Sequence, residues 1–151
     1  MFRGVNNINL DAKGRMAIPT RYRDRLQSGC ENQLVVTIDT EEPCLLIYPL
    51  PDWEDIQRKI ESLPSFNPQA RRIQRLLIGH ATDIEMDGNG RLLLTQPLRD
   101  YARLERKAVL LGQGGKFELW SESCWIERRD AYLDDMGSMG ALPVELESLS
   151  L

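Results

Sequence analysis

The sequence predicts a mainly β fold with α-helices, of the α+β class, in which one small unit occurs twice in tandem. Three observations support this: a motif that recurs in both halves, short strand-like segments around glycine turns, and helical spacing between and after the units. The chain has 151 residues, which is short for two domains that each bury a separate core. We therefore expect the two halves to share one core.

The repeat is clearest in two short motifs. Residues 10–16 read Leu-Asp-Ala-Lys-Gly-Arg-Met and residues 86–92 read Met-Asp-Gly-Asn-Gly-Arg-Leu, so both follow the pattern apolar-Asp-x-x-Gly-Arg-apolar. Apolar runs then recur in the same order in both halves, followed by Trp53 and Trp125. An ordered series of matches indicates duplication. The paired motif residues are Asp11 and Asp87, Gly14 and Gly90, and Arg15 and Arg91.

Each unit is expected to contain a strand, a tight turn, a second strand, a short helix and two further strands. In the first unit, apolar residues alternate with asparagines over 7–10, as in a half-buried strand, and Gly14 suits a hairpin turn. Pro19 ends the second strand, and the four-residue spacing of Tyr22 and Leu26 predicts one or two helical turns. The two later apolar runs of each unit predict a second hairpin.

Longer helices are expected outside the units. Pro51 suits the first turn of one helix, and Asn-Pro at 67–68 suits the cap and first residue of the next. A serine at 121 or 123 can cap a third helix. The predicted organisation is a basic first unit at 1–50, linking helices at 51–79, a second unit at 80–121, a C-terminal helix at 122–136 and an acidic tail at 137–151, mobile unless it docks on a neighbour.

The charge distribution points to an anionic partner for the first unit. The net charge of −4 by itself disfavours nucleic acid, but from Asp130 onward acidic residues occur without any lysine or arginine. Within residues 1–25, Asp11 and Asp24 accompany a larger basic set, consisting of Arg3, Lys13, Arg15, Arg21, Arg23 and Arg25. The chain therefore has a basic head, suited to phosphate, and an acidic end.

Several protein classes are disfavoured. No apolar run reaches the roughly 20 residues of a membrane helix, and residues 1–7 do not read as a secretory signal, so a cytoplasmic protein is expected. The three cysteines are widely separated, which predicts neither a disulfide framework nor a metal site. We expect no cofactor, no membrane partner and no small-molecule substrate.

The sequence does not predict an enzyme. His80, the single histidine, falls on the apolar stripe of a helix, where a packed imidazole is expected rather than a general base. No serine or cysteine has a recognisable partner base. The tryptophans have apolar neighbours and are expected in cores or subunit interfaces rather than stacked on bases.

Residues 11–19, Asp-Ala-Lys-Gly-Arg-Met-Ala-Ile-Pro, resemble the swapped-hairpin DNA-binding fold of the AbrB and MazE type. Two copies in one chain, each followed by an aromatic pair such as Tyr48 and Trp53, resemble the MraZ family of bacterial transcriptional regulators. The opening Met-Phe-Arg-Gly and the stretch 71–81 are similar to that family as well, so the resemblance covers about residues 1–133.

This resemblance implies two interleaved swapped-hairpin units that form a shared β-barrel, and ring-like homo-oligomers associated with the nucleoid. It also implies repression of the protein's own operon, in the division and cell wall gene cluster, through direct repeats of double-stranded DNA near the promoter. The second copy departs from the first, because Asp83, Glu85 and Asp87 surround Arg91. Their charge favours a structural role for Arg91, in which it holds its turn.

Arg15 is the candidate for a DNA base contact. A two-stranded β-ribbon can enter the major groove, where a guanidinium matches guanine O6 and N7. The alternative is that Asp11 and Arg15 pair with each other across the turn, although the surrounding basic excess favours DNA. The phosphate-contact candidates, for which a solvated helix face is an equal alternative, are Arg3, Lys13, Arg21, Arg23 and Arg25. For Arg71, Arg72 and Arg75, an ordinary polar face is favoured over a subunit interface or a DNA contact.

Two functions remain open from the sequence. The first is sequence-specific transcriptional repression, which the duplicated motif and the basic head favour. The second is an antitoxin-like or scaffold ring that binds another protein through its helices and acidic tail. Selectivity for one DNA sequence distinguishes the two.

Overall fold

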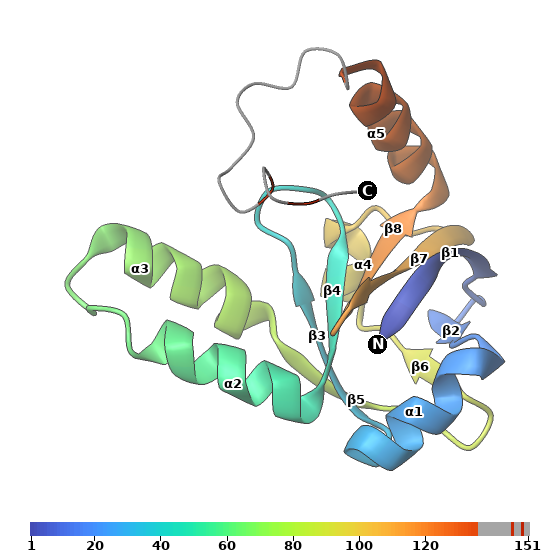
Figure 1. Ribbon diagram of the computed structural model, residues 1–151, viewed down its shortest axis with the longest axis horizontal. Helices are drawn as coiled ribbons and strands as arrows, with labels where there is room; N and C mark the ends of the chain where they lie inside the picture. Colours follow the sequence, from blue (N-terminus) through green and yellow to red (C-terminus); the bar gives the residue numbers. More distant parts are fainter. Residues whose placement is uncertain (136–145, 147–148, 150–151) are drawn as a thin grey trace.

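The computed structural model describes residues 1–135, 146 and 149 (Figure 1). The strands are β1 (Phe2–Asn9), β2 (Arg15–Ala17), β3 (Gln33–Ile38), β4 (Leu45–Pro49), β5 (Thr82–Glu85), β6 (Arg91–Leu93), β7 (Lys107–Gly114) and β8 (Phe117–Ser121). The helices are α1 (Thr20–Cys30), α2 (Leu50–Glu61), α3 (Pro68–Ile73), the π-helical turn η1 (Gln74–Ile78), α4 (Gln96–Tyr101) and α5 (Glu122–Asp134). The tail expected at 137–151 lies outside the described residues, apart from Leu146 and Leu149.

The two units are interleaved. Six strands form one antiparallel sheet in the order β1-β7-β8-β4-β3-β5. Strand β1 of the first unit pairs with β7 of the second, with Ile8 opposite Ala108. Strand β5 of the second unit pairs with β3 of the first in the equivalent register, with Ile84 opposite Leu34. This reciprocal exchange confirms the α+β class and the two tandem units.

The shared β-barrel that the resemblance implies is not closed in the described residues. Within residues 1–135, no ladder joins β1 to β5, so these two strands are the edges of an open sheet. After each edge strand the chain turns at its motif into a three-residue strand, β2 or β6. These two strands pair with each other as a separate ribbon instead of extending the sheet, which is why the sheet does not close.

The main core lies between this ribbon and one face of the sheet. Met16 of β2 and Leu92 of β6 are fully buried there, beside Phe2 and Phe117, whose rings stack with centroids 4.3 Å apart. Both units supply these residues, so one core serves the two units. A smaller cluster packs against α5 and consists of Cys44, Val109, Leu111 and Trp120, with Cys124 and Trp125 of the helix.

The helices begin at the expected caps. Asn67 caps α3 and Ser121 caps α5, each through a side-chain oxygen that accepts from backbone N–H groups. Helix α1 is longer than the one or two turns expected, because Tyr22, Leu26 and Cys30 form a buried stripe along its full length. In the described part of the chain, no helix combines the length and the apolar character needed to cross a bilayer.

Residues 50–78, here called the arm, form a helical hairpin of α2 with α3 and η1 that projects from the sheet (Figure 1). The sequence predicts a continuous α-helix up to His80, whereas the structure contains the π-helical turn at 74–78. Contacts outside the helix accompany this turn, since the Leu77 carbonyl accepts from Thr37 Oγ1 at 2.7 Å. At the tip of the arm, Phe66 is 88% exposed.

Candidate nucleic-acid interface

The β2–β6 ribbon places both motif arginines on one outward face. Three pairs of residues face each other across it, Arg15 and Leu93, Met16 and Leu92, and Ala17 and Arg91. Because the central pair is fully buried, the alternation of side chains directs the flanking pairs away from the core. We call the four outward side chains, Arg15, Ala17, Arg91 and Leu93, the ribbon face. It combines two cationic side chains with two apolar ones, of which Leu93 is 55% exposed.

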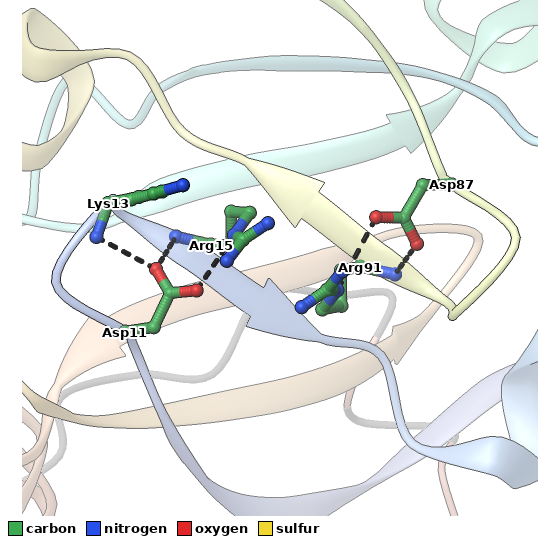
Figure 2. A network of polar contacts seen from close by, with 5 residues as sticks. All are labelled: Asp11, Lys13, Arg15, Asp87 and Arg91. Carbon is green, nitrogen blue, oxygen red and sulfur yellow. Dashed lines mark hydrogen bonds and ion pairs between the residues drawn. The ribbon is translucent and has the colours of Figure 1, made fainter.

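Asp11 organises the first turn. Its Oδ1 accepts from the backbone N–H groups of Lys13 and Arg15, both at 2.9 Å, and its Oδ2 accepts from Arg15 Nε at 2.7 Å (Figure 2). These bonds stabilise the carboxylate, chiefly the one from the Arg15 backbone, and lower the pKa of Asp11 to about 2. Gly14 completes the turn with a φ of +85°, which glycine adopts without strain.

The second motif forms the same turn. Asp87 Oδ1 accepts from the backbone N–H groups of Asn89 at 2.8 Å and Arg91 at 2.9 Å. The bond from the Arg91 backbone is the main cause that lowers the pKa of Asp87. Arg91 Nε lies 3.4 Å from Asp87 Oδ2, a longer ion pair than in the first turn. The second turn therefore holds its arginine less closely than the first.

The pairing of Asp11 with Arg15, the alternative to a DNA contact, is present in the structure. It uses Arg15 Nε, and within residues 1–135 neither terminal nitrogen of Arg15 donates a hydrogen bond. A bidentate contact needs two N–H groups on one guanidinium edge, and the edge formed by Nη1 and Nη2 satisfies that requirement. The ion pair can therefore orient Arg15 while its outer edge serves a ligand.

A groove of about 800 Å³ lies beside the ribbon face. The arginines that line it come from both units and are Arg15, Arg91, Arg99 and Arg106. The sequence places Arg91 among acidic neighbours, whereas the fold brings it to the same groove as Arg15. Arg99 and Arg106 are not among the contact residues that the sequence predicts. Arg99 is the counterpart of Arg23 in the repeat, so the duplication could have indicated it as a candidate, whereas Arg106 belongs to no motif.

Three of the phosphate-contact candidates gather at the start of β1. Arg21 donates to Asn6 Oδ1, Arg25 donates to the carbonyl of Met1, and Arg3 lies on the strand itself. Strand geometry places this group about 20 Å from the first turn. The basic head predicted from the sequence is therefore divided between two places rather than forming one patch.

The other two candidates lie at the motif turns. Lys13 is exposed in the first turn, beside Arg15 (Figure 2). Arg23 donates its Nε to the carbonyl of Ile18 at 2.8 Å, and its guanidinium lies against Gly90 of the second turn. Lys13 is thus placed at the edge of the ribbon face, whereas Arg23 contacts the protein backbone.

The remaining residues singled out from the sequence lie elsewhere. His80 lies just after the arm, and its Nδ1 is 2.8 Å from the carbonyl of Leu76. Trp53 and Trp120 are buried. The three linker arginines, at 71, 72 and 75, are exposed on the arm, away from the ribbon.

One group of described residues has donor atoms close enough to surround a metal ion: Asp39, Cys44 and Glu118 lie within 4.8 Å of one another. Burial raises the pKa of the Cys44 thiol well above its usual value, which disfavours the thiolate that a metal requires. Glu118 Oε1 already accepts from Trp120 Nε1 at 2.9 Å. We therefore assign no metal to this group.

Comparison with known proteins places the chain in a family. The family model described as "MraZ protein, putative antitoxin-like" matches twice, at residues 1–76 and 77–136. The chain is 60% identical to the transcriptional regulator MraZ of Alkalilimnicola ehrlichii over the full length of both. Proteins of the same name from Halorhodospira halophila and Pseudomonas aeruginosa strain LESB58 are 57% and 54% identical, again over both full lengths. None of these three relatives is named as an enzyme. With its two copies of the motif turn and these matches along its length, the chain belongs to the MraZ family.

Proposed function

We propose that the protein is a sequence-specific DNA-binding transcriptional regulator. It represses its own operon, in the division and cell wall gene cluster, by binding direct repeats near the promoter, and it acts in the cytoplasm at the nucleoid. The observation that carries the proposal is the ribbon face, where Arg15 and Arg91 project from one antiparallel ribbon beside a groove lined by two further arginines. The names of the relatives support regulation of transcription.

The ribbon face suits the major groove of B-DNA, which is about 12 Å wide and admits a two-stranded β-ribbon. The outer edge of Arg15 matches guanine O6 and N7, and such a contact contributes about 1–3 kcal/mol of discrimination between bases. Leu93 and Ala17, beside the arginines, suit the methyl groups of thymine. Direct reading of bases by the ribbon thus accounts for sequence specificity.

Phosphate contacts fix the orientation of the ribbon on DNA. Lys13 lies next to the ribbon face and reaches the backbone that borders the groove. Arg3, Arg21 and Arg25 lie about 20 Å along β1, and they reach a neighbouring stretch of the backbone. Arg23 affects phosphate binding through the second turn, which it contacts.

We further propose that several copies assemble into a ring. The arm supports this because its apolar side chains Leu63, Phe66 and Ile73 are exposed in the single chain. A ring presents several ribbon faces to one DNA segment. Once one ribbon face is bound to a repeat, the effective concentration of the other ribbon faces at the neighbouring repeat is raised. Direct repeats in the operator fit such an array.

The test is a binding titration with a duplex from upstream of the protein's own gene and a shuffled duplex of the same composition. Wild type is expected to prefer the upstream duplex by about a thousandfold or more. Arg15→Ala is expected to weaken binding to that duplex by about 5- to 150-fold, as loss of a bidentate contact predicts. The matched control is Arg129→Ala, because Arg129 lies on α5 and pairs with the adjacent Asp130.

Two results would contradict the proposal. If wild type binds both duplexes equally, the protein is not a sequence-specific regulator. If folded Arg15→Ala binds as tightly and selectively as wild type, Arg15 does not read a base. Arg129→Ala should match wild type with both duplexes.

The second candidate function is an antitoxin-like or scaffold ring that binds another protein. The family description and the exposed apolar tip of the arm favour it. Purification from cells followed by light scattering should then give one stoichiometric protein partner, and the purified protein should show no preference between the two duplexes. The regulator proposal predicts the opposite outcome in the titration.

A further inference from the structure

Each motif turn accepts a backbone hydrogen bond from the opposite unit. The Leu94 N–H donates to the carbonyl of Gly14 at 3.0 Å, and the Ile18 N–H donates to the carbonyl of Gly90 at 2.8 Å. Leu94 directly follows β6 and Ile18 directly follows β2, so both bonds cross from one unit to the other. The two turns are thus linked through the ends of the ribbon.

An arginine adds a second contact at each turn. Arg99 Nε donates to the carbonyl of Leu94 at 3.2 Å, and its guanidinium lies so close to Gly14 that a Cβ at this position would displace it. Arg23 Nε donates in the same way to the carbonyl of Ile18, and its guanidinium occupies the space that a Cβ at Gly90 would take. Each arginine belongs to the helix that follows the motif in its own unit, yet each contacts the turn of the other unit.

We propose that Arg99 is the positioning residue for the first turn and for Arg15, and that Arg23 has the same role for the second turn and Arg91. The path is short: Arg99 lies against Gly14, the Gly14 N–H donates to the carbonyl of Asp11 at 3.0 Å, and Asp11 holds Arg15. The inference rests on the proposed function where it concerns DNA, because Arg15 must read a base for its position to affect selectivity.

A phosphate contact is the competing role for Arg99, because Arg99 also lines the groove. The two roles have different chemical requirements. A phosphate contact depends on the positive charge, which lysine retains. Loss of one such contact reduces the slope of the logarithm of the binding constant against the logarithm of the salt concentration by about one. Positioning depends on the Nε donor and on the planar guanidinium against Gly14, which lysine lacks.

The first experiment uses the free protein, so its outcome does not depend on DNA. Amide hydrogen exchange is measured by NMR in wild type, Arg99→Ala, Arg99→Lys and Arg23→Ala, after circular dichroism has shown that each is folded. Both Arg99 variants are expected to speed exchange at Gly14, Arg15 and Leu94 by about tenfold or more. Arg23→Ala should instead affect Gly90, Arg91 and Ile18, which makes each variant the control for the other.

The second experiment repeats the two-duplex titration with the Arg99 variants over a series of salt concentrations. Both variants are expected to lose about tenfold in preference for the upstream duplex, with an unchanged salt dependence. Unchanged amide exchange at residues 11–15 in Arg99→Ala would overturn the inference. Recovery of selectivity in Arg99→Lys, with a reduced salt dependence in Arg99→Ala, would overturn it too, in favour of a phosphate contact.

The two proposals can fail separately. Absence of any preference in the wild-type protein would refute the proposed regulator, and exchange in the free protein would still decide whether Arg99 positions the first turn. Normal wild-type selectivity with unchanged exchange in Arg99→Ala would refute positioning and leave the regulator proposal standing.

Discussion

Asp11 connects the backbone of the first turn to Arg15, and its ionisation sets the pH range of that connection. In the folded protein its pKa is about 2, below the usual 3.8, so folding favours the ionised form. The stabilising contribution is therefore complete above about pH 3.8 and is lost as the pH falls through about 2.

The prediction is that the backbone amide resonances of Lys13 and Arg15 stay constant from about pH 8 to 5 and shift with a midpoint near 2. An NMR titration in acid measures this, and the backbone amide of the exposed Asp24 on α1 is followed in the same spectra for comparison. A midpoint for the turn amides at about 3.8 would mean that Asp11 does not accept these hydrogen bonds.

At the residue scale, side chains that repeat at fixed spacing can be predicted from the sequence, whereas those whose partners lie far along the chain cannot. Asp11, Gly14 and Arg15 were found because the same pattern occurs again at 87–91. Arg91 has acidic neighbours in the sequence, yet pairing of β2 with β6 brings it opposite Ala17. The placement of Arg99 against Gly14 depends on the exchange between units, which local spacing does not encode.

The element that carries the proposed site is the glycine turn between each edge strand and the ribbon. Gly90 has a φ of +74°, and Arg23 occupies the space of a Cβ there, whereas Gly88 in the same turn has nothing within 4 Å of its would-be Cβ. Gly90→Ala is expected to lower the free energy of unfolding by about 1–2 kcal/mol from the backbone strain, and it also displaces the Arg23 side chain.

The matched variant Gly88→Ala is expected to change the free energy of unfolding by no more than about 0.5 kcal/mol. Urea unfolding followed by tryptophan fluorescence compares the two variants with wild type. Equal losses in both variants would contradict the assignment of a special conformation to Gly90.

Among the elements, strands and helix caps could be predicted because they depend on neighbouring residues. Alternation, the turn glycines and the Asn67 cap are all local signals, and the corresponding elements are present. The π-helical turn at 74–78 could not be predicted in this way, because its contact with Thr37 comes from a distant strand. The open edges of the sheet likewise follow from the pairing of β2 with β6 rather than from any local pattern.

The whole molecule depends on exchange between its halves. Strand β1 pairs with β7, and β5 pairs with β3, so each unit completes the sheet of the other. We expect that residues 1–79 and residues 80–151, produced separately, do not fold as monomers, and that mixing them restores the circular dichroism spectrum of the intact chain. A monomeric half that unfolds cooperatively on its own would contradict the shared core.

The central claim is that the ribbon face contacts DNA, and site-specific photocrosslinking tests it most directly. A photoreactive side chain is placed at Ala17, exposed on the ribbon face, or at Phe66, 88% exposed at the tip of the arm, and the protein is irradiated with the upstream duplex. The account predicts a crosslink to DNA from position 17 and none from position 66. A crosslink from position 66 without one from position 17 would contradict it.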